Sequence, residues 1–129
     1  MRNSVEAPHL TAPASNFGIP DSEVAAVSLE DDALTLLLRC GKTVTFRDMQ
    51  PSCCEKRYLR TEDDIQAVVG LKLRKIELSS VFVDEDSRGD VHEVCFLKLE
   101  FDSWGHITLC SHNEHNGYYG GIDLIVEVT

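Results

Sequence analysis

The stretch EVCFLKLEF at residues 93–101 decides the fold, because every second residue from Cys95 onward is apolar. A period of two is typical of a β-strand that buries one face. The residues placed on that face are Cys95, Leu97, Leu99 and Phe101. A tight turn at residues 102–105 leaves no room for a crossover helix, so the strand predicted at residues 106–112 pairs antiparallel with the first.

Strands are also predicted before and after this hairpin. Apolar runs at residues 24–29 and 34–39 flank an acidic turn and predict a second hairpin. Residues 42–48 alternate as a half-buried strand, and residues 122–128 form a terminal strand. Connections this short favour an antiparallel sheet.

Residues 72–83 predict a strand with a bend. The residues that share one of its sides are Ile76, Leu78, Ser80 and Phe82. Leu71 and Leu73 have the opposite parity, which predicts a bulge near Arg74 and Lys75.

Residues 61–70 predict the one helix. Thr61 is a capping residue, acidic residues follow it, and Gly70 stands where a left-handed residue ends a helix. The expected fold class is α+β, mainly β: a twisted antiparallel sheet of about six or seven strands with one short helix. Residues 1–22, which are rich in proline, are expected to form an irregular arm, and residues 23–129 a single β-rich domain.

The composition predicts a cytoplasmic protein with reduced thiols. Apolar runs fall far short of the roughly 20 residues that span a bilayer, and residues 1–20 lack the apolar stretch of a secretory signal. Five cysteines, with Cys53 next to Cys54, do not suit a disulfide framework. Cys40 and Cys95 are expected in the core.

The net charge of −10 is unevenly distributed. Residues 84–129 hold ten acidic and two basic residues, whereas residues 39–75 hold nine basic and five acidic. A strongly acidic surface attracts basic protein surfaces and repels nucleic-acid phosphates. We therefore expect a protein partner with a basic surface, and no direct contact with nucleic acid or membrane. The alternative is that the acidity serves solubility alone.

The segment at residues 112–121 is the most unusual in composition. It combines an Asn-Gly pair, two tyrosines and a Gly-Gly pair, which suits a binding surface between flexible points. The alternative is a plain hairpin loop whose tyrosines cover the core edge.

Metal binding and catalysis are less favoured by the sequence than binding. Cys110, His112 and His115 come nearest to a zinc site, but their spacing matches no standard motif, so we expect no metal and no cofactor. Cys53 or Cys54 paired with a histidine would make a nucleophile, yet no catalytic signature accompanies them. We therefore expect a protein that is not an enzyme.

Two short motifs, Cys53-Cys54-Glu55 and Asn116-Gly117-Tyr118-Tyr119, carry a resemblance over roughly residues 33–128. The chain resembles an uncharacterised family of small phage and bacterial domains that share both elements. This resemblance implies a mobile-element or bacterial setting and no particular activity. It also predicts that the two motifs meet in space, as a structural corner or as a recognition face.

The leading hypothesis is a non-enzymatic acidic interaction protein, such as a phage-borne inhibitor that binds a basic surface of a host defence or nucleic-acid-binding protein. The expected binding residues are Glu55, Asp84, Glu85, Asp86, Asp90, Glu114, Asn116, Gly117, Tyr118 and Tyr119. The exposed sheet edges also allow a homodimer.

Two alternatives remain open. One is a small-molecule or nucleotide-binding domain in which Tyr118 and Tyr119 stack on a base while Arg47, Arg57 or Arg60 meets phosphate. The other is a site based on zinc or a thiol.

Overall fold

A long antiparallel hairpin occupies the centre of one sheet. In the computed structural model of the chain, which describes residues 2–6, 10–30, 32–48, 56–103, 105–116 and 122–129, strand β9 covers Val91–Phe101 and strand β10 covers His106–His115. They pair from His106 opposite Glu100 to His115 opposite Val91. The predicted inward residues of β9 are buried, and buried residues also alternate along β10, which confirms the period of two.

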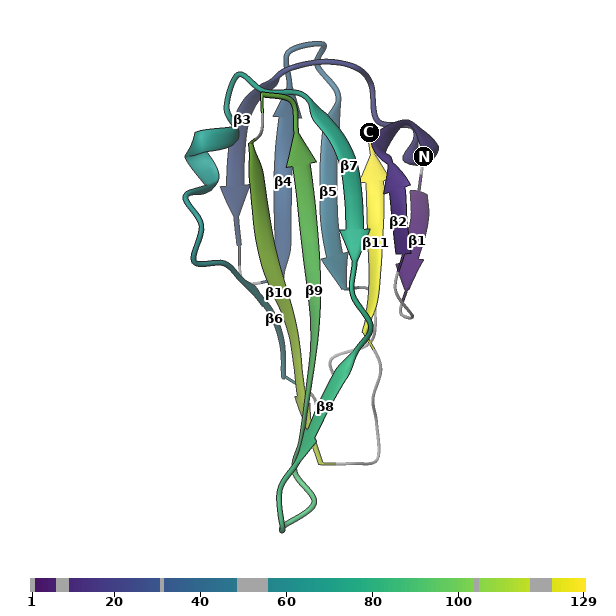
Figure 1. Cartoon of the computed structure of the whole chain (residues 1–129), viewed down its shortest axis with the longest axis vertical. Coiled ribbons are helices and arrows are strands. Elements are labelled where there is room, and N and C mark those ends of the chain that lie inside the picture. Colours follow the sequence, from purple (N-terminus) through teal and green to yellow (C-terminus); the bar gives the residue numbers. More distant parts are fainter. Residues whose placement is uncertain (1, 7–9, 31, 49–55, 104, 117–121) are drawn as a thin grey trace.

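Two antiparallel sheets face each other (Figure 1). The β9 sheet runs β2 (Leu10–Pro13), β7 (Leu73–Leu78), β9, β10 and β6 (Lys56–Arg60), and β8 (Phe82–Glu85) pairs with the end of β9. The β4 sheet runs β1 (Arg2–Glu6), β11 (Asp123–Val128), β5 (Thr43–Asp48), β4 (Ala33–Leu38) and β3 (Val24–Leu29). A mainly β, antiparallel fold is therefore confirmed, but the described ranges contain eleven strands in two sheets where one sheet was predicted.

The core fills the space between the two sheets. Leu34, Leu36 and Leu38 face inward from β4, and Ile76 and Leu78 face inward from β7 of the other sheet. The side chains that are completely buried also include Phe46, Leu59, Leu97, Leu99, Ile107, Leu109 and Leu124. Each sheet thus buries alternate residues against the other, which is how a β-sandwich is stabilised.

The prediction of a helix is wrong, because residues 61–70 form a loop with one 3-10 turn, η2 (Ile65–Val68). The capping signals are real, since Asp64 accepts a hydrogen bond from Gln66 N. The segment is hydrogen-bonded to neighbouring strands at both ends. Asp63 accepts a hydrogen bond from Thr108 N at 2.7 Å, and Gly70 N donates one to Val24 O. Between these two hydrogen bonds the chain forms a single 3-10 turn and no α-helix.

The predicted irregular arm also requires correction. β1 pairs with β11 and β2 pairs with β7, so residues 2–6 and 10–13 add an edge strand to each sheet. A second 3-10 turn, η1 (Ala14–Phe17), follows and buries Phe17. Proline is tolerated on edge strands, which explains why a proline-rich segment still pairs. Within the described ranges, no helix has the length and apolarity needed to cross a membrane.

Two bulges set the direction of side chains along β7 and β8. The register shift between Leu73 and Lys75 confirms the predicted bulge. A second shift was not predicted: Leu78 lies opposite Leu97 and Phe82 opposite Val94, so three residues face two. This extra residue reverses the parity and turns Phe82 outward, contrary to the prediction that it shares a side with Leu78.

Adjacent leucines on β4 test the packing. We expect Leu36→Ala to lower the free energy of unfolding by about 2–5 kcal/mol, because Leu36 is completely buried. Leu37→Ala removes the same atoms from a side chain that is 43% exposed. This variant should change the free energy of unfolding by about 0.5 kcal/mol or less. Chemical denaturation of both variants measures the difference, and equal losses would contradict the sandwich assignment.

Candidate functional site

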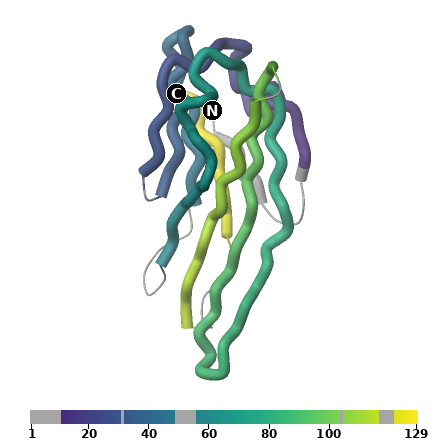
Figure 2. Tube along the Cα trace, turned by 60° about the vertical axis from the view of Figure 1, so that its left-hand side comes forward, coloured from purple at the N-terminus to yellow at the C-terminus, as the bar shows by residue number. Residues whose placement is uncertain are grey.

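The hairpin of β8 and β9 extends beyond the rest of the molecule (Figures 1 and 2). We call residues 82–94 the projection. All four residues of β8 are exposed, and the large apolar side chains of Phe82 and Val83 are 57% and 63% exposed. Asp86 closes the turn by accepting hydrogen bonds from the backbone nitrogens of Arg88 and Asp90.

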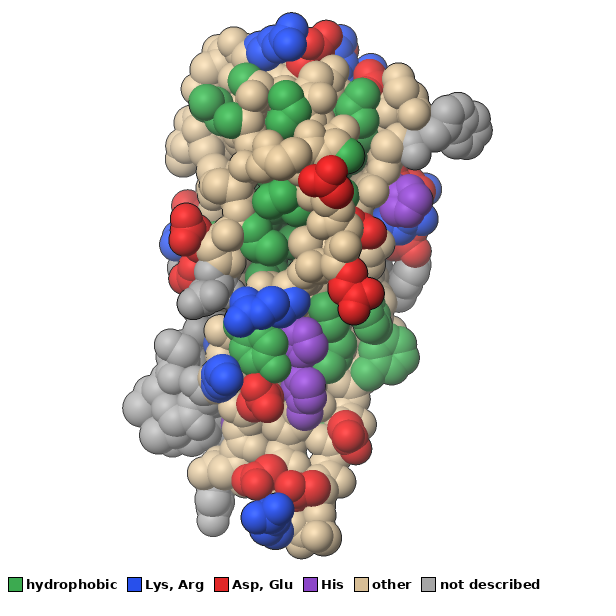
Figure 3. All heavy atoms as spheres, turned by 90° about the vertical axis from the view of Figure 1, so that its left-hand side faces the viewer, with side chains coloured by type: hydrophobic (Ala, Val, Ile, Leu, Met, Phe, Trp, Pro, Cys, Tyr) green, Lys and Arg blue, Asp and Glu red, His purple; other side chains and the backbone are tan. Residues whose placement is uncertain are grey.

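The base of the projection joins a cross-strand row on the outer face of the β9 sheet, the face turned away from the β4 sheet. Phe82, Val94, His112 and Tyr58 lie opposite one another on β8, β9, β10 and β6. The rings of Tyr58 and His112 stack at 4.5 Å, and Phe82 meets Phe96 edge-on at 6.0 Å. Figure 3 shows this face, with histidines between hydrophobic side chains and carboxylates toward the lower end.

An acidic row runs beside the first. Asp84 of β8 lies opposite His92, which lies opposite Glu114 of β10. The residues that line an open cavity of about 540 Å³ at this place are Asp84, Asp86, Asp90, Val91, His92, Glu114, His115 and Asn116. The structure thus brings together five of the predicted binding residues. Glu55, Gly117, Tyr118 and Tyr119 lie outside the described residues.

His92 and His112 join the two rows. Nε2 of His92 lies 2.8 Å from Nδ1 of His112. Burial lowers the pKa of His112, the neighbouring His92 lowers it further, and Glu114 opposes both. His92 was not predicted as a site residue, although it shares the outward parity of Val94 and Phe96 on β9.

Cations lie at the opposite end of the outer face, on β6. The Arg60 guanidinium lies 4.9 Å and the Lys56 ammonium 5.5 Å from the centre of the Tyr58 ring. Burial raises the pKa of Tyr58, and a hydrogen bond to the Glu114 carboxylate raises it further, so its hydroxyl is protonated at neutral pH. The face is therefore basic at β6 and acidic at the projection.

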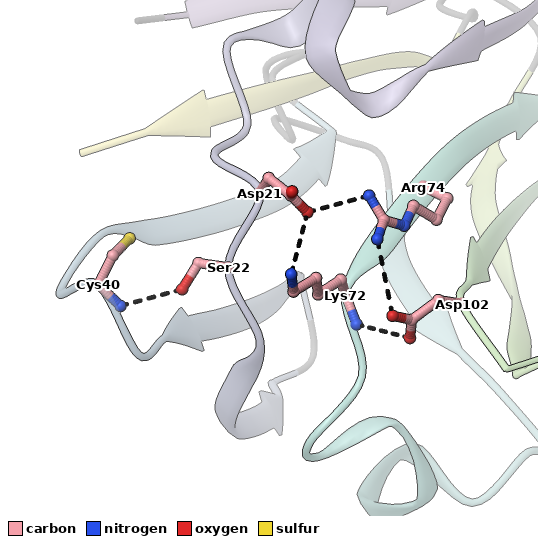
Figure 4. Close-up of polar contacts among 6 residues, drawn as sticks. All are labelled: Asp21, Ser22, Cys40, Lys72, Arg74 and Asp102. Carbon is pink, nitrogen blue, oxygen red and sulfur yellow. Dashed lines mark hydrogen bonds and ion pairs between the residues drawn. The ribbon is translucent and has the colours of Figure 1, made fainter.

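Part of the predicted acidic surface is neutralised within the domain. Glu100 pairs with Lys75 and Lys98. These contacts lower the pKa of Glu100, and the hydrogen bond from Lys75 contributes most. Asp102 accepts from Lys72 N and faces Arg74, which also binds Asp21 (Figure 4). Several carboxylates of residues 84–129 are thus already paired within the domain. The exposed ones lie mainly on the projection.

Two further acidic residues also have internal partners. Glu127 pairs with Arg47, and the buried Glu93 contacts His115 with Oε1 and Nε2 2.6 Å apart. Glu93 and His115 share the buried face of β9 and β10 with Ser111 and Asn113, and Asn113 lies opposite Glu93.

The two predicted motifs are bounded by strand ends that contact each other. Asp48, at the end of β5, pairs with Arg57 of β6 at 2.6 Å, and both side chains are only 6% exposed. Asp123 N, at the start of β11, donates to the other oxygen of Asp48 at 3.1 Å. One carboxylate therefore joins the strands on either side of residues 49–55 to the strand that follows residues 117–121. The motif contacts themselves lie outside the described residues.

The three nearest candidates for a zinc site do not converge. Cys110 and His112 face outward, whereas His115 faces inward and contacts Glu93, because strand residues of opposite parity lie on opposite faces. The described part of the chain contains no group of three or more potential metal ligands close enough to hold an ion.

The candidate phosphate-binding arginines contact other groups of the domain. Arg47 pairs with Glu127, Arg57 with Asp48, and Arg60 lies on the Tyr58 ring. Two of the three guanidinium charges are therefore already matched by carboxylates.

Three described cysteines differ in environment. Cys95 is buried, as predicted, and burial raises its pKa to about 11. Cys40 is exposed in the turn after β4, contrary to its predicted place in the core, and hydrogen bonds from Lys42 N–H and Ser22 lower its pKa. Cys110 is half-buried, which raises its pKa.

The fold and the site define a two-sheet antiparallel β-sandwich with an exposed acidic hairpin. The chain belongs to the DUF7448 family, a domain of unknown function, whose profile matches residues 19–125. No curated protein and no solved structure matches the chain. Membership of an uncharacterised family is thus confirmed, whereas the phage setting and the shared motifs stay predictions.

The Asp48–Arg57 pair should be essential for stability. Arg57→Met leaves a buried carboxylate without its cation and is expected to cost about 3–5 kcal/mol in the free energy of unfolding. Adding Asp48→Asn removes the unpaired carboxylate charge. The double variant should therefore lose less free energy of unfolding than Arg57→Met alone. Breaking the exposed Glu23–Arg39 pair with Arg39→Met should cost at most about 1 kcal/mol. Equal losses for both single variants in denaturant titrations would contradict the assignment.

Thiol reactivity should follow these environments. In the folded protein at about pH 8, iodoacetamide should modify Cys40 at least about tenfold faster than Cys95, because the thiolate is the nucleophile. Peptide mass spectrometry after timed quenching measures both rates. In denaturant the difference should vanish, and fast native modification of Cys95 would contradict its burial.

Proposed function

We propose that this protein is a non-enzymatic interaction protein whose projection binds a basic surface of a partner protein. The observation that carries the proposal is the full exposure of β8, which presents Phe82 and Val83 next to Asp84 and Glu85. Exposed apolar patches with a polar rim mark interaction sites, and clustered carboxylates accelerate encounter with a basic partner.

The projection is suited to insertion into a groove. Phe82 belongs to the outer face, and Val83, with opposite parity, lies on the other side of the same strand. A flat partner would cover one of these side chains and leave the other in water. A groove whose two walls both carry apolar and basic groups covers both side chains and pairs with the carboxylates.

The charges around the outer-face cavity disfavour the alternative of a nucleotide-binding domain. An open cavity of about 700 Å³ on the outer face is lined by Arg60, Phe96 and His112, among others. Glu62 and Asp63 line the same cavity, and their carboxylates repel phosphate groups.

The setting proposed for this interaction is the cytoplasm of a bacterial host, with the protein acting as a phage-borne inhibitor of a defence or nucleic-acid-binding protein. The support is the acidity of the projection, since the groove of a nucleic-acid-binding protein is basic. A homodimer through an open sheet edge is compatible with this proposal.

The test compares capture of bacterial proteins by wild type and by variants of the projection. Phe82→Ser with Val83→Ser, and separately Asp84→Lys with Glu85→Lys, should abolish capture of the specific partner, because they remove the apolar contact and the charge. High salt should weaken the wild-type complex by about tenfold or more, since exposed charges are screened.

Matched controls exist elsewhere on the surface. Glu30→Lys with Asp32→Lys makes the same charge change in the exposed turn before β4, and Leu37→Ser removes another exposed apolar side chain. Both controls should retain the partner, as quantified by mass spectrometry. Capture that is unchanged in the projection variants, or insensitive to salt, would overturn the proposal.

A further inference from the structure

The two imidazoles at the base of the projection form a hydrogen bond of a particular kind. The nitrogens of His92 and His112 are 2.8 Å apart, the ring planes are inclined by 26°, and the ring centres are 5.0 Å apart. The centre-to-centre distance exceeds the nitrogen separation by about two ring radii, so the rings lie edge to edge. The shared hydrogen therefore lies between the nitrogens in an N–H···N bond.

Such a bond limits how many protons the pair holds. One nitrogen must donate its N–H and the other must offer a lone pair, so at least one ring is neutral. When both rings are protonated, two N–H groups face each other across 2.8 Å and two positive charges adjoin, so the bond breaks. The pair thus has a closed form with at most one extra proton and an open form with two.

The charged and titratable neighbours determine what opening does. From β6, Tyr58 stacks on His112, with Arg60 and Lys56 beside its ring. On β10, Glu114 lies opposite His92 and Cys110 precedes His112; from β8, Asp84 lies opposite His92. Arg60 adjoins the His112 end and Asp84 adjoins the His92 end, while Lys56 lies opposite Glu114. An opened, protonated His92 is therefore drawn to Asp84.

We propose that the His92–His112 pair is a proton-operated latch that releases the basic partner in mild acid. The inference rests on the proposed function and adds its regulation. In the closed form the exposed Asp84 is available to basic groups of the partner, while Glu114 accepts a hydrogen bond from Tyr58. In the open form the His92 imidazolium neutralises Asp84 from within the protein, and the face loses attraction for a cation. Binding is thus retained at neutral pH and lost as the pH falls below the usual histidine range.

The first experiment needs no partner. A nuclear magnetic resonance titration of the free protein should show that His92 and His112 take up protons in two coupled steps, with chemical-shift changes at both rings in each step. His106→Gln, on the same outer face of β10, should leave the coupling unchanged, whereas His112→Gln should leave a single-step curve for His92. Independent single-step titrations of both histidines in the wild type would overturn the latch.

The second experiment measures binding with a defined probe, a fluorescent peptide of alternating lysine and leucine. Its affinity for the wild type should fall by about tenfold between about pH 7.5 and pH 5. The His92→Gln, His112→Gln double variant should lose less than about twofold, and His106→Gln should behave as wild type. The single variant His92→Gln, which removes the imidazole that lies opposite Asp84 and Glu114, replaces the double variant if circular dichroism shows that the latter is unfolded.

The outcomes separate the two proposals. No probe binding at either pH would overturn the proposed function and, with it, the release of a partner. Binding that is equal at both pH values, or a loss in acid that persists in the glutamine variants, would overturn the latch alone.

Discussion

The strict alternation of side chains along β9 is the constraint on which the rest of the structure depends. Every residue of this eleven-residue strand belongs either to the face that packs on the β4 sheet or to the outer face. The inward set supplies the centre of the core, with Leu97 and Leu99 completely buried. The outward set, which includes His92, Val94 and Phe96, therefore lies at the surface. One strand thus fixes the core and the candidate binding face together.

The bulge at residues 79–81 connects packing to the candidate function. Ser79 accepts the Phe96 N–H with its hydroxyl, Ser79 N donates to Phe96 O, and the Cys95 thiol donates to Ser79 O. These contacts stabilise one extra residue in the strand. Without it, Phe82 would continue the inward row of Ile76 and Leu78, and β8 would lack the apolar side chain that its outer face presents. A local irregularity in hydrogen bonding therefore decides which residues meet a partner.

The sequence predicted the elements more successfully than their assembly. Alternation identified most strands, and the parity change at Arg74 was enough to predict a bulge. It could not assign strands to two sheets, because a strand buried on one face reads the same whether a helix or a second sheet covers it. The helix prediction failed because Thr61, Asp63 and Asp64 are capping residues in loops as well as in helices, and here they bind Thr108 and Gln66. For the site, the acidic residues were identified from charge, but His92 was not, since its role depends on its neighbours across two strands.

The edge strands β1 and β2 have a consequence for the solubility of the whole molecule. Each covers the outer hydrogen-bonding groups of a longer strand, β11 in one sheet and β7 in the other. A bare strand edge is a template for pairing between molecules, which leads to aggregation. Strands β1 and β2 thus cover one edge of each sheet, and a chain without them would expose the edges of β11 and β7 to pairing with other molecules while keeping most of its core.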